Sequence, residues 1–254
     1  IFDEAHNCNG EKVSNILNDE TEKTLLGKIR YFSATLNTGI NRGMLFDYFF
    51  SRAVQNRIIR DFDIQCVIAP KGTEHNEHHY LLEEITKIAR STKTCRYLGF
   101  CQWSEAERDT GSSVLAMVNE FQKCSNGNWI EGVTGKDSRK QRDCKLNKFQ
   151  EEEHTDSVLK LLISCRSLAE GVDLKNVHGC ILFDPRQSEI EIKQIIGRSV
   201  RPLRDEDNNA LPWDQQTPSN IILPLFFDPD KVQEFEDDID GESNYLKEEI
   251  LNQE

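Results

Sequence analysis

The chain has 254 residues, which allows one large domain or two small ones. With 37% hydrophobic and 30% charged residues it can build a core, and no apolar run approaches the ~20 residues that span a bilayer, which argues against a membrane protein. The formal net charge of −13 argues against a non-specific electrostatic binder of nucleic acid, but it leaves local contacts open.

The cysteines and the first residues indicate where the protein resides. None of the eight cysteines forms a C-x-x-C pair, and Ile1 to Asn9 contain no basic cluster of the kind that opens a signal peptide. We therefore expect reduced, mostly buried thiols in an intracellular protein, with cytoplasm, nucleus and viral factory not distinguished.

Short apolar runs recur along the chain and are separated by polar, helix-like segments. Runs that are apolar without strict alternation are typical of strands buried on both faces of a parallel sheet. They lie at 29–32, 64–69, 97–101, 161–165, 179–183 and 221–227. Apolar residues at helical spacing predict helices over 81–89 and 114–121, so the order of elements indicates an α/β fold.

The composition of the remaining segments predicts loops and an acidic C-terminal segment. Residues 72–79, 125–129 and 205–219 are polar and predict loops. The first of them holds His75, His78 and His79, for which a solvated loop is favoured over a metal site. After Phe227 the composition turns acidic, and exposed helices are expected over 232–239 and 245–251.

Two short motifs near the start of the chain contain residue types that could form part of a nucleotide site. Asp3-Glu4-Ala5-His6 follows an apolar pair, and adjacent carboxylates at a strand end suit a magnesium–nucleotide site, although an exposed helix start would read the same way. Ser33-Ala34-Thr35 follows the run at 29–32, where small hydroxyl residues would reach the carboxyl edge of a sheet. An ordinary strand-to-loop turn is the alternative for this second motif.

Two further motifs lie in the second half of the chain. Glu170-Gly171-Val172-Asp173 follows the run at 161–165, and it could be a ligand loop or a turn with a capping aspartate. In Gln194-Ile195-Ile196-Gly197-Arg198-Ser199-Val200-Arg201, a helix would place Gln194, Arg198 and Arg201 on one face, with Gly197 leaving room for close packing. Paired arginines suit a polyphosphate. A solvated basic face is the alternative, and Pro202 disfavours it because the helix is expected to stop where the arginines point.

The four motifs in this order resemble motifs II, III, V and VI of the superfamily 2 DEAD/DEAH-like helicases. Ser33, Ser167 and Phe183-Asp184-Pro185-Arg186-Gln187-Ser188 also resemble one branch, the predicted helicases related to type III restriction motor subunits and to helicases of large DNA viruses. The stretch from Arg42 to Phe62 resembles the segment between motifs III and IV of that branch. Each motif is weak alone, but the ordered set is specific.

The resemblance implies a role for each matching residue. Asp3 would hold Mg²⁺ through water and Glu4 would be the general base, while His6, Ser33 and Thr35 would couple hydrolysis to movement of the lobes. On the other side of an ATP molecule, the resemblance implies nucleotide contacts from Gly171, Asp173 and Gln194 and arginine fingers at Arg198 and Arg201. Gly135 and Arg142 resemble the family's segment near the nucleic-acid backbone.

One part of the family pattern is missing from the chain. No G-x-x-x-x-G-K-[ST] occurs, because Gly27-Lys28 is followed by Ile29 and Gly135-Lys136 by Asp137. Truncation upstream of Ile1 is the simplest explanation, and it predicts a chain that is inactive alone although its parent hydrolyses ATP.

These patterns predict two RecA-like pieces built on parallel sheets. Residues 1–57 would be the rear of lobe 1, residues 58–228 a near-complete lobe 2, and residues 229–254 an acidic C-terminal segment. The expected function is ATP-dependent and Mg²⁺-dependent movement on DNA or RNA, with DNA slightly favoured and the oligomeric state left open. A non-catalytic helicase-like binding module and a restriction-type motor subunit remain as alternatives.

Overall fold

The computed structural model describes residues 50–70, 77–104, 113–151, 159–165, 173–186 and 188–227. The chain divides into two compact units, residues 1–48 and 49–254, and every described residue belongs to the second unit. The expected strand at 29–32, the motifs at Asp3 to His6 and at Ser33 to Thr35, and the acidic C-terminal segment lie outside the described residues. The expected partial first lobe therefore stays a prediction, as do the expected domain boundaries.

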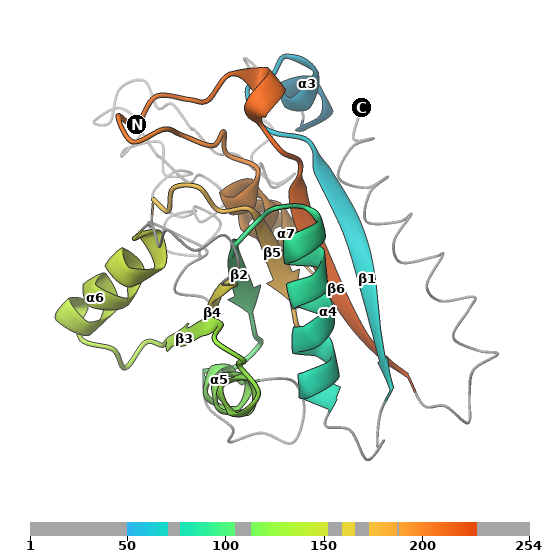
Figure 1. The fold of residues 1–254 in the computed structure, drawn as a ribbon, viewed down its shortest axis with the longest axis vertical. Coiled ribbons are helices and arrows are strands. Elements are labelled where there is room, and N and C mark those ends of the chain that lie inside the picture. Colours follow the sequence, from blue (N-terminus) through green and yellow to red (C-terminus); the bar gives the residue numbers. More distant parts are fainter. Residues whose placement is uncertain are drawn as a thin grey trace, which may run out of the picture. The chain divides into compact units, whose positions relative to one another are not determined.

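The second unit is built on a six-stranded sheet in which every described pairing is parallel (Figure 1). The strand order is β1-β6-β5-β2-β4-β3. The strands are β1 (Phe62–Pro70), β2 (Arg96–Phe100), β3 (Trp129–Val133), β4 (Lys160–Ser164), β5 (Gly179–Leu182) and β6 (Ser219–Phe227). This sheet confirms the predicted α/β class.

Helices cover both faces of the sheet and make a three-layer unit. The helices are α3 (Phe50–Gln55), α4 (Glu77–Ser91), α5 (Val114–Lys123), α6 (Arg139–Gln150) and α7 (Glu189–Ser199), with a 3-10 turn η3 at Trp213–Gln215. One core cluster joins α4 and α5 to the sheet through residues such as Ile85, Phe121 and Ile163. The other joins α6 and α7 through residues such as Phe149, Leu162 and Ile195.

Alternation along the central strands explains why both faces are apolar. In β2, Leu98 and Phe100 enter the cluster with α6 and α7, whereas Tyr97 enters the cluster with α4 and α5. The five residues of β2 and of β4 are all buried, as expected for central strands of a parallel sheet. Strand β5 begins at Gly179, where a Cβ would lie 2.2 Å from the carbonyl oxygen of Asn220 in β6, so only glycine permits this close approach.

The structure confirms the predicted strands in the described residues and adds elements that were not predicted. Strand β3 and helix α6 were missed. Helix α4 begins at Glu77, so His78 and His79 lie in its first turn and not in a loop, and the His78 ring packs edge-on against Phe121. No helix among the described residues has the length and apolarity needed to cross a membrane.

Candidate nucleotide-facing site

Helix α7 carries most of the fourth sequence motif. Its N-cap is Ser188, whose side chain accepts a hydrogen bond from the main-chain N–H of Glu191. Ile192, Ile195 and Ile196 are buried against the sheet. The apolar face of α7 thereby fixes the helix, and Gln194 and Arg198, one turn apart, are left only partly buried.

The helix ends earlier than the motif does, so one part of the prediction was wrong. Helix α7 stops at Ser199, and its C-cap Val200 donates its N–H to Ile196. Arg201 lies beyond this cap and therefore does not continue the helical face of Gln194 and Arg198. Pro202 disfavours helical backbone at the residue before it, which is Arg201. Of the two predicted arginine fingers, Arg198 therefore stands on helical backbone and Arg201 on the backbone beyond the helix.

Arg201 forms an ion pair with Asp173, so the structure brings two sequence motifs together. The guanidinium of Arg201 donates from Nη1 to Oδ1 of Asp173. The side chains are 41% and 79% exposed, so solvent screens the pair and it contributes only about 0–1 kcal/mol. Of the other residues of the third motif, Gly171 lies outside the described residues.

A second connection joins the same two segments a few residues further on. Arg204 donates its main-chain N–H to Oδ1 of Asn176 at 2.7 Å, and Asn176 Nδ2 donates to the Arg204 carbonyl at 2.9 Å. Asn176 has a φ of +54°, a conformation that asparagine tolerates better than most residues. The segment before β5 and the segment after α7 are therefore held together at two points.

A third connection comes from a residue that no sequence motif includes. Arg60 is 1% exposed, and its guanidinium donates to four main-chain carbonyls. The acceptors are the carbonyls of Val177, Ser199, Arg201 and Thr217. In the sequence Arg60 stands next to Asp61, just before an apolar run, and nothing in that pattern distinguishes it from an exposed charge.

These connections place the end of α7 at the amino edge of the sheet. Arg60, Val177 and Thr217 each precede a strand, namely β1, β5 and β6. The predicted nucleic-acid residues Gly135 and Arg142 follow β3 and so lie at the carboxyl edge, in a turn and on α6. The structure thus keeps the two predicted groups of residues on opposite edges.

The turn that contains Gly135 is held by Asp137 and Lys145. Asp137 accepts the N–H of Thr134 at 2.7 Å, and Lys145 donates to Asp137 at 2.8 Å and to the Gly132 carbonyl at 2.6 Å. Partial burial opposes ionisation of Asp137, but the Lys145 ammonium and the Thr134 N–H together hold its pKa below the usual range. A Cβ at Gly135 would meet no described atom within 4 Å, so the turn is open on that side.

Two further expectations, on Gly197 and on the cysteines, differ from what the structure shows. Gly197 was expected to leave room for close packing, but a Cβ there would meet no described atom within 4 Å. The thiols are free, but of the seven described cysteines only Cys101 and Cys180 are buried. Within the described ranges no three His, Cys, Asp or Glu side chains gather as a metal site, and the expected Mg²⁺ residue Asp3 lies outside these ranges.

A hollow of about 630 Å³ lies elsewhere, along the outward face of α6, where Arg139, Lys140 and Lys148 line it. Asp173 and Gln194, the described residues expected to contact nucleotide, do not line it. The half-buried Arg198 and the 41% exposed Arg201 suit a different ligand. Two guanidinium groups within one short segment match the oxygens of a polyphosphate.

The six-stranded parallel sheet with helices on both faces has the architecture of a RecA-like lobe. Residues 78–202 match the family described as the helicase conserved C-terminal domain. This stretch runs from α4 through α7 and ends just after Arg201. Most of the described unit therefore resembles a helicase C-terminal domain.

Comparisons with individual proteins agree with this assignment. The chain is 32% identical over 88 residues to "Nucleoside triphosphatase I" of Choristoneura biennis entomopoxvirus, a match that covers 34% of this chain and 13% of the relative. The "ATP-dependent Type ISP restriction-modification enzyme LlaBIII bound to DNA" has a similar fold, with a TM-score of 0.62 and 16% identity over 90% of this chain and 18% of that one. A fragment of a putative HsdR subunit of a type I restriction enzyme from Vibrio vulnificus YJ016 has a TM-score of 0.50 and 19% identity, covering 76% of this chain and 39% of that one. The chain therefore spans a small part of the length of these proteins.

Proposed function

We propose that this chain is the ATP-responsive second lobe of a superfamily 2 motor, which hydrolyses ATP between two RecA-like lobes and moves along nucleic acid. The observation that carries this proposal is the joining of two motifs at the end of α7. Asp173 is paired with Arg201, and Arg198 stands on the last turn of the same helix. The same three residues were expected, on resemblance, to face a nucleotide.

The ion pair suggests how the lobe responds to nucleotide. A screened surface pair worth about 0–1 kcal/mol is easily exchanged for another anion. A triphosphate offers more negative charge and more acceptor oxygens than one carboxylate, so it can draw the Arg201 guanidinium away from Asp173. In the motor, Arg198 and Arg201 would then stabilise charge on the transferring phosphoryl group, a contribution of ~10³–10⁵ in rate in related systems.

The remaining roles are proposed on the sequence resemblance. Glu4 would deprotonate the attacking water and Asp3 would hold the Mg²⁺ that neutralises phosphate charge. His6, Ser33 and Thr35 would couple hydrolysis to movement, and Gly171 and Gln194 would help to close the site. The chain carries no G-x-x-x-x-G-K-[ST], so we propose that it does not turn over ATP by itself.

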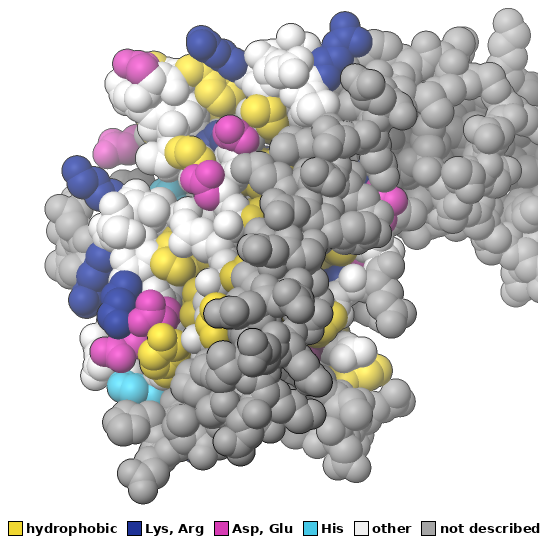
Figure 2. All heavy atoms as spheres, turned by 90° about the vertical axis from the view of Figure 1, so that its right-hand side faces the viewer, with side chains coloured by type: hydrophobic (Ala, Val, Ile, Leu, Met, Phe, Trp, Pro, Cys, Tyr) yellow, Lys and Arg dark blue, Asp and Glu magenta, His cyan; other side chains and the backbone are white. Residues whose placement is uncertain are grey.

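Nucleic acid is the proposed track, with DNA slightly favoured over RNA. Gly135 and Arg142 at the carboxyl edge are the proposed contacts on this lobe. Figure 2 shows the side of the lobe away from α6, and there the basic and acidic side chains of the described residues are interspersed. The net charge of −13 indicates that binding would depend on a few local contacts and main-chain N–H groups.

The test compares the 254-residue chain with the complete protein that contains it. Steady-state phosphate release is measured for both with no nucleic acid, with single-stranded or double-stranded DNA, and with RNA. We expect turnover only from the complete protein, with stimulation by nucleic acid. A complete protein that binds nucleic acid but releases no phosphate would contradict the proposal and favour a non-catalytic binding module.

A further inference from the structure

Arg60 is the largest fully buried side chain among the described residues. Its Nε donates to the Arg201 carbonyl at 2.8 Å, and its Nη2 donates to the Ser199 carbonyl. Its main-chain N–H donates to the Val200 carbonyl at 2.7 Å. One residue thus binds three consecutive carbonyls of the segment that follows Arg198.

The same guanidinium also binds the segments that lead into two strands. Nη1 donates to the Thr217 carbonyl at 2.7 Å, before β6, and Nη2 donates to the Val177 carbonyl at 2.5 Å, before β5. These strands are neighbours at the centre of the sheet, and β1 lies beside β6. Through Arg60 the end of α7 is attached to the sheet and to the segment that carries Asp173.

The chemistry of this contact suits the end of a helix. The last carbonyls of a helix lack intrahelical partners and carry a partial negative charge, which a cation stabilises. A planar guanidinium can donate to several carbonyls in fixed directions, which a lysine ammonium cannot do in the same geometry. Burial lowers the pKa of Arg60 to about 10, so it keeps its charge at neutral pH.

We propose that Arg60 is a positioning residue for catalysis, because it fixes the backbone from Ser199 to Arg201 and thereby the directions in which Arg198 and Arg201 leave the end of α7. This inference rests on the proposed function of those two arginines. Arg60 itself is buried, so it would act through the backbone of this segment. Catalysis depends steeply on geometry, since a displacement of about 1 Å can cost ~10²-fold in rate.

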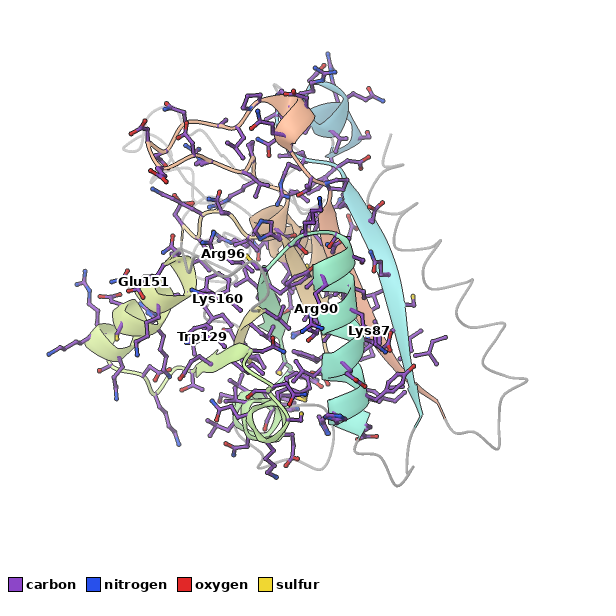
Figure 3. All side chains as sticks on the ribbon, in the orientation of Figure 1. Lys87, Arg90, Arg96, Trp129, Glu151 and Lys160 are labelled. Carbon is purple, nitrogen blue, oxygen red and sulfur yellow. The ribbon has the colours of Figure 1, made fainter. Side chains whose placement is uncertain are left out.

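The lobe contains a matched control for this role. Lys160 is buried at the start of β4, and its ammonium donates to the carbonyls of Lys148 at 3.1 Å and Glu151 at 2.6 Å at the end of α6 (Figure 3). Lys160 is therefore a buried cation that binds the end of a helix without contacting the α7 segment. Lys160→Met should perturb the fold in a manner comparable with Arg60→Met, but away from the arginine fingers.

The first measurement is amide hydrogen exchange on the 254-residue chain. In Arg60→Met we expect exchange at Val200, Leu203 and Arg204 to accelerate at least about tenfold, while the Glu151 amide at the end of α6 keeps its rate. Lys160→Met should give the reverse pattern. Unchanged exchange at these three residues in Arg60→Met would overturn the inference.

The second measurement is ATP turnover by the complete protein in saturating nucleic acid. Arg60→Met should lower kcat at least about tenfold with KM for ATP changed less than about threefold, because misaligned fingers act on the transition state. Lys160→Met should leave kcat within about twofold. Arg60→Lys, which keeps the charge and can reach some of the carbonyls, should recover part of the loss and stands in for Arg60→Met if that variant does not fold.

The outcomes separate this inference from the proposed function. If the unsubstituted complete protein releases no phosphate, the proposed function fails, and hydrogen exchange still decides whether Arg60 holds the α7 segment. If turnover is present but Arg60→Met keeps kcat within twofold, or Lys160→Met loses as much as Arg60→Met, the positioning role is wrong.

Discussion

His178 is a buried histidine whose neutral form the fold requires. It lies just before β5, and its Nδ1 accepts the main-chain N–H of Arg96 at 3.2 Å. Burial is the main reason that its pKa falls to about 3, and the nearby charges of Arg60 and Arg96 lower it further. Protonation would place a third cation among these two buried arginines.

This environment predicts an acid-sensitive contribution to stability. Above pH 6.5 the imidazole of His178 is mostly neutral in the folded and the unfolded chain. Between pH 6.5 and about 3 it is protonated in the unfolded chain but stays neutral in the folded lobe. The free energy of unfolding should therefore fall as the pH is lowered, by about 2 kcal/mol from pH 7.5 to pH 5 for this group. Urea unfolding at the two pH values measures the drop, and His178→Asn should reduce it by that amount. An equal drop in this variant would exclude His178 as the cause.

The cysteines predict a second contrast between residues. Burial raises the pKa of the Cys180 thiol to about 12, whereas Cys144 is exposed on α6. The thiolate is the reactive form, so a disulfide reagent at pH 8 should label Cys144 quickly and Cys180 only after unfolding. Mass spectrometry of labelled peptides distinguishes the two sites. Rapid labelling of Cys180 in the native chain would contradict its place in the core.

At the scale of the element, helix α7 differs from its sequence pattern in an instructive way. The spacing of Gln194, Arg198 and Arg201 in the sequence predicts one helical face, but the helix ends at Ser199. The carbonyls at this end are bound by Arg60, a residue 141 positions away from Arg201 in the sequence. Pro202 indicates from the sequence that the helix stops close to Arg201, but periodicity carries no information about the long-range contact that binds its last carbonyls.

The elements that were missed have a local explanation. Helix α6 fully buries only Phe149, with Leu146 partly buried beside it, so it has little hydrophobic periodicity. Its capping box, formed by Ser138 and Gln141, is a sequence signal that could have located its start. Strand β3 is a short edge strand that contains Glu131 and Gly132. The central strands β2 and β4, by contrast, contain apolar runs that were predicted to within one residue.

Gly197 provides a prediction that separates stability from activity. It lies inside α7, and an added Cβ would meet no described atom within 4 Å. Gly197→Ala should therefore raise the free energy of unfolding of this chain by about 0.5–1 kcal/mol, because alanine loses less backbone entropy in a helix. Urea unfolding measures this gain. If the space beside Gly197 is filled by nucleotide or by the first lobe in the working protein, the same variant should lower ATP turnover, and a gain in stability with unchanged turnover would mean that the space stays empty.

At the scale of the whole lobe, the two edges of the sheet separate two proposed tasks. The amino edge holds the end of α7, with Arg198, Arg201, Asp173 and the buried Arg60. The carboxyl edge holds Gly135 and α6, the proposed side for nucleic acid. The α/β class and the ordered motifs could be predicted from the sequence because apolar runs and short polar signatures are local. The attachment of one motif to another could not, because Asp173, Arg60 and Arg201 meet only in the folded lobe.

The central claim is that the guanidinium of Arg201 completes an ATP site from the side of this lobe. The most direct test is kcat for ATP in the complete protein with Arg201→Ala, compared with Arg90→Ala on α4, which covers the other face of the sheet (Figure 3). We expect Arg201→Ala to lower kcat by about 10³-fold or more, with Arg90→Ala within about twofold of the unsubstituted protein. Turnover by Arg201→Ala equal to that of the unsubstituted protein would contradict the account.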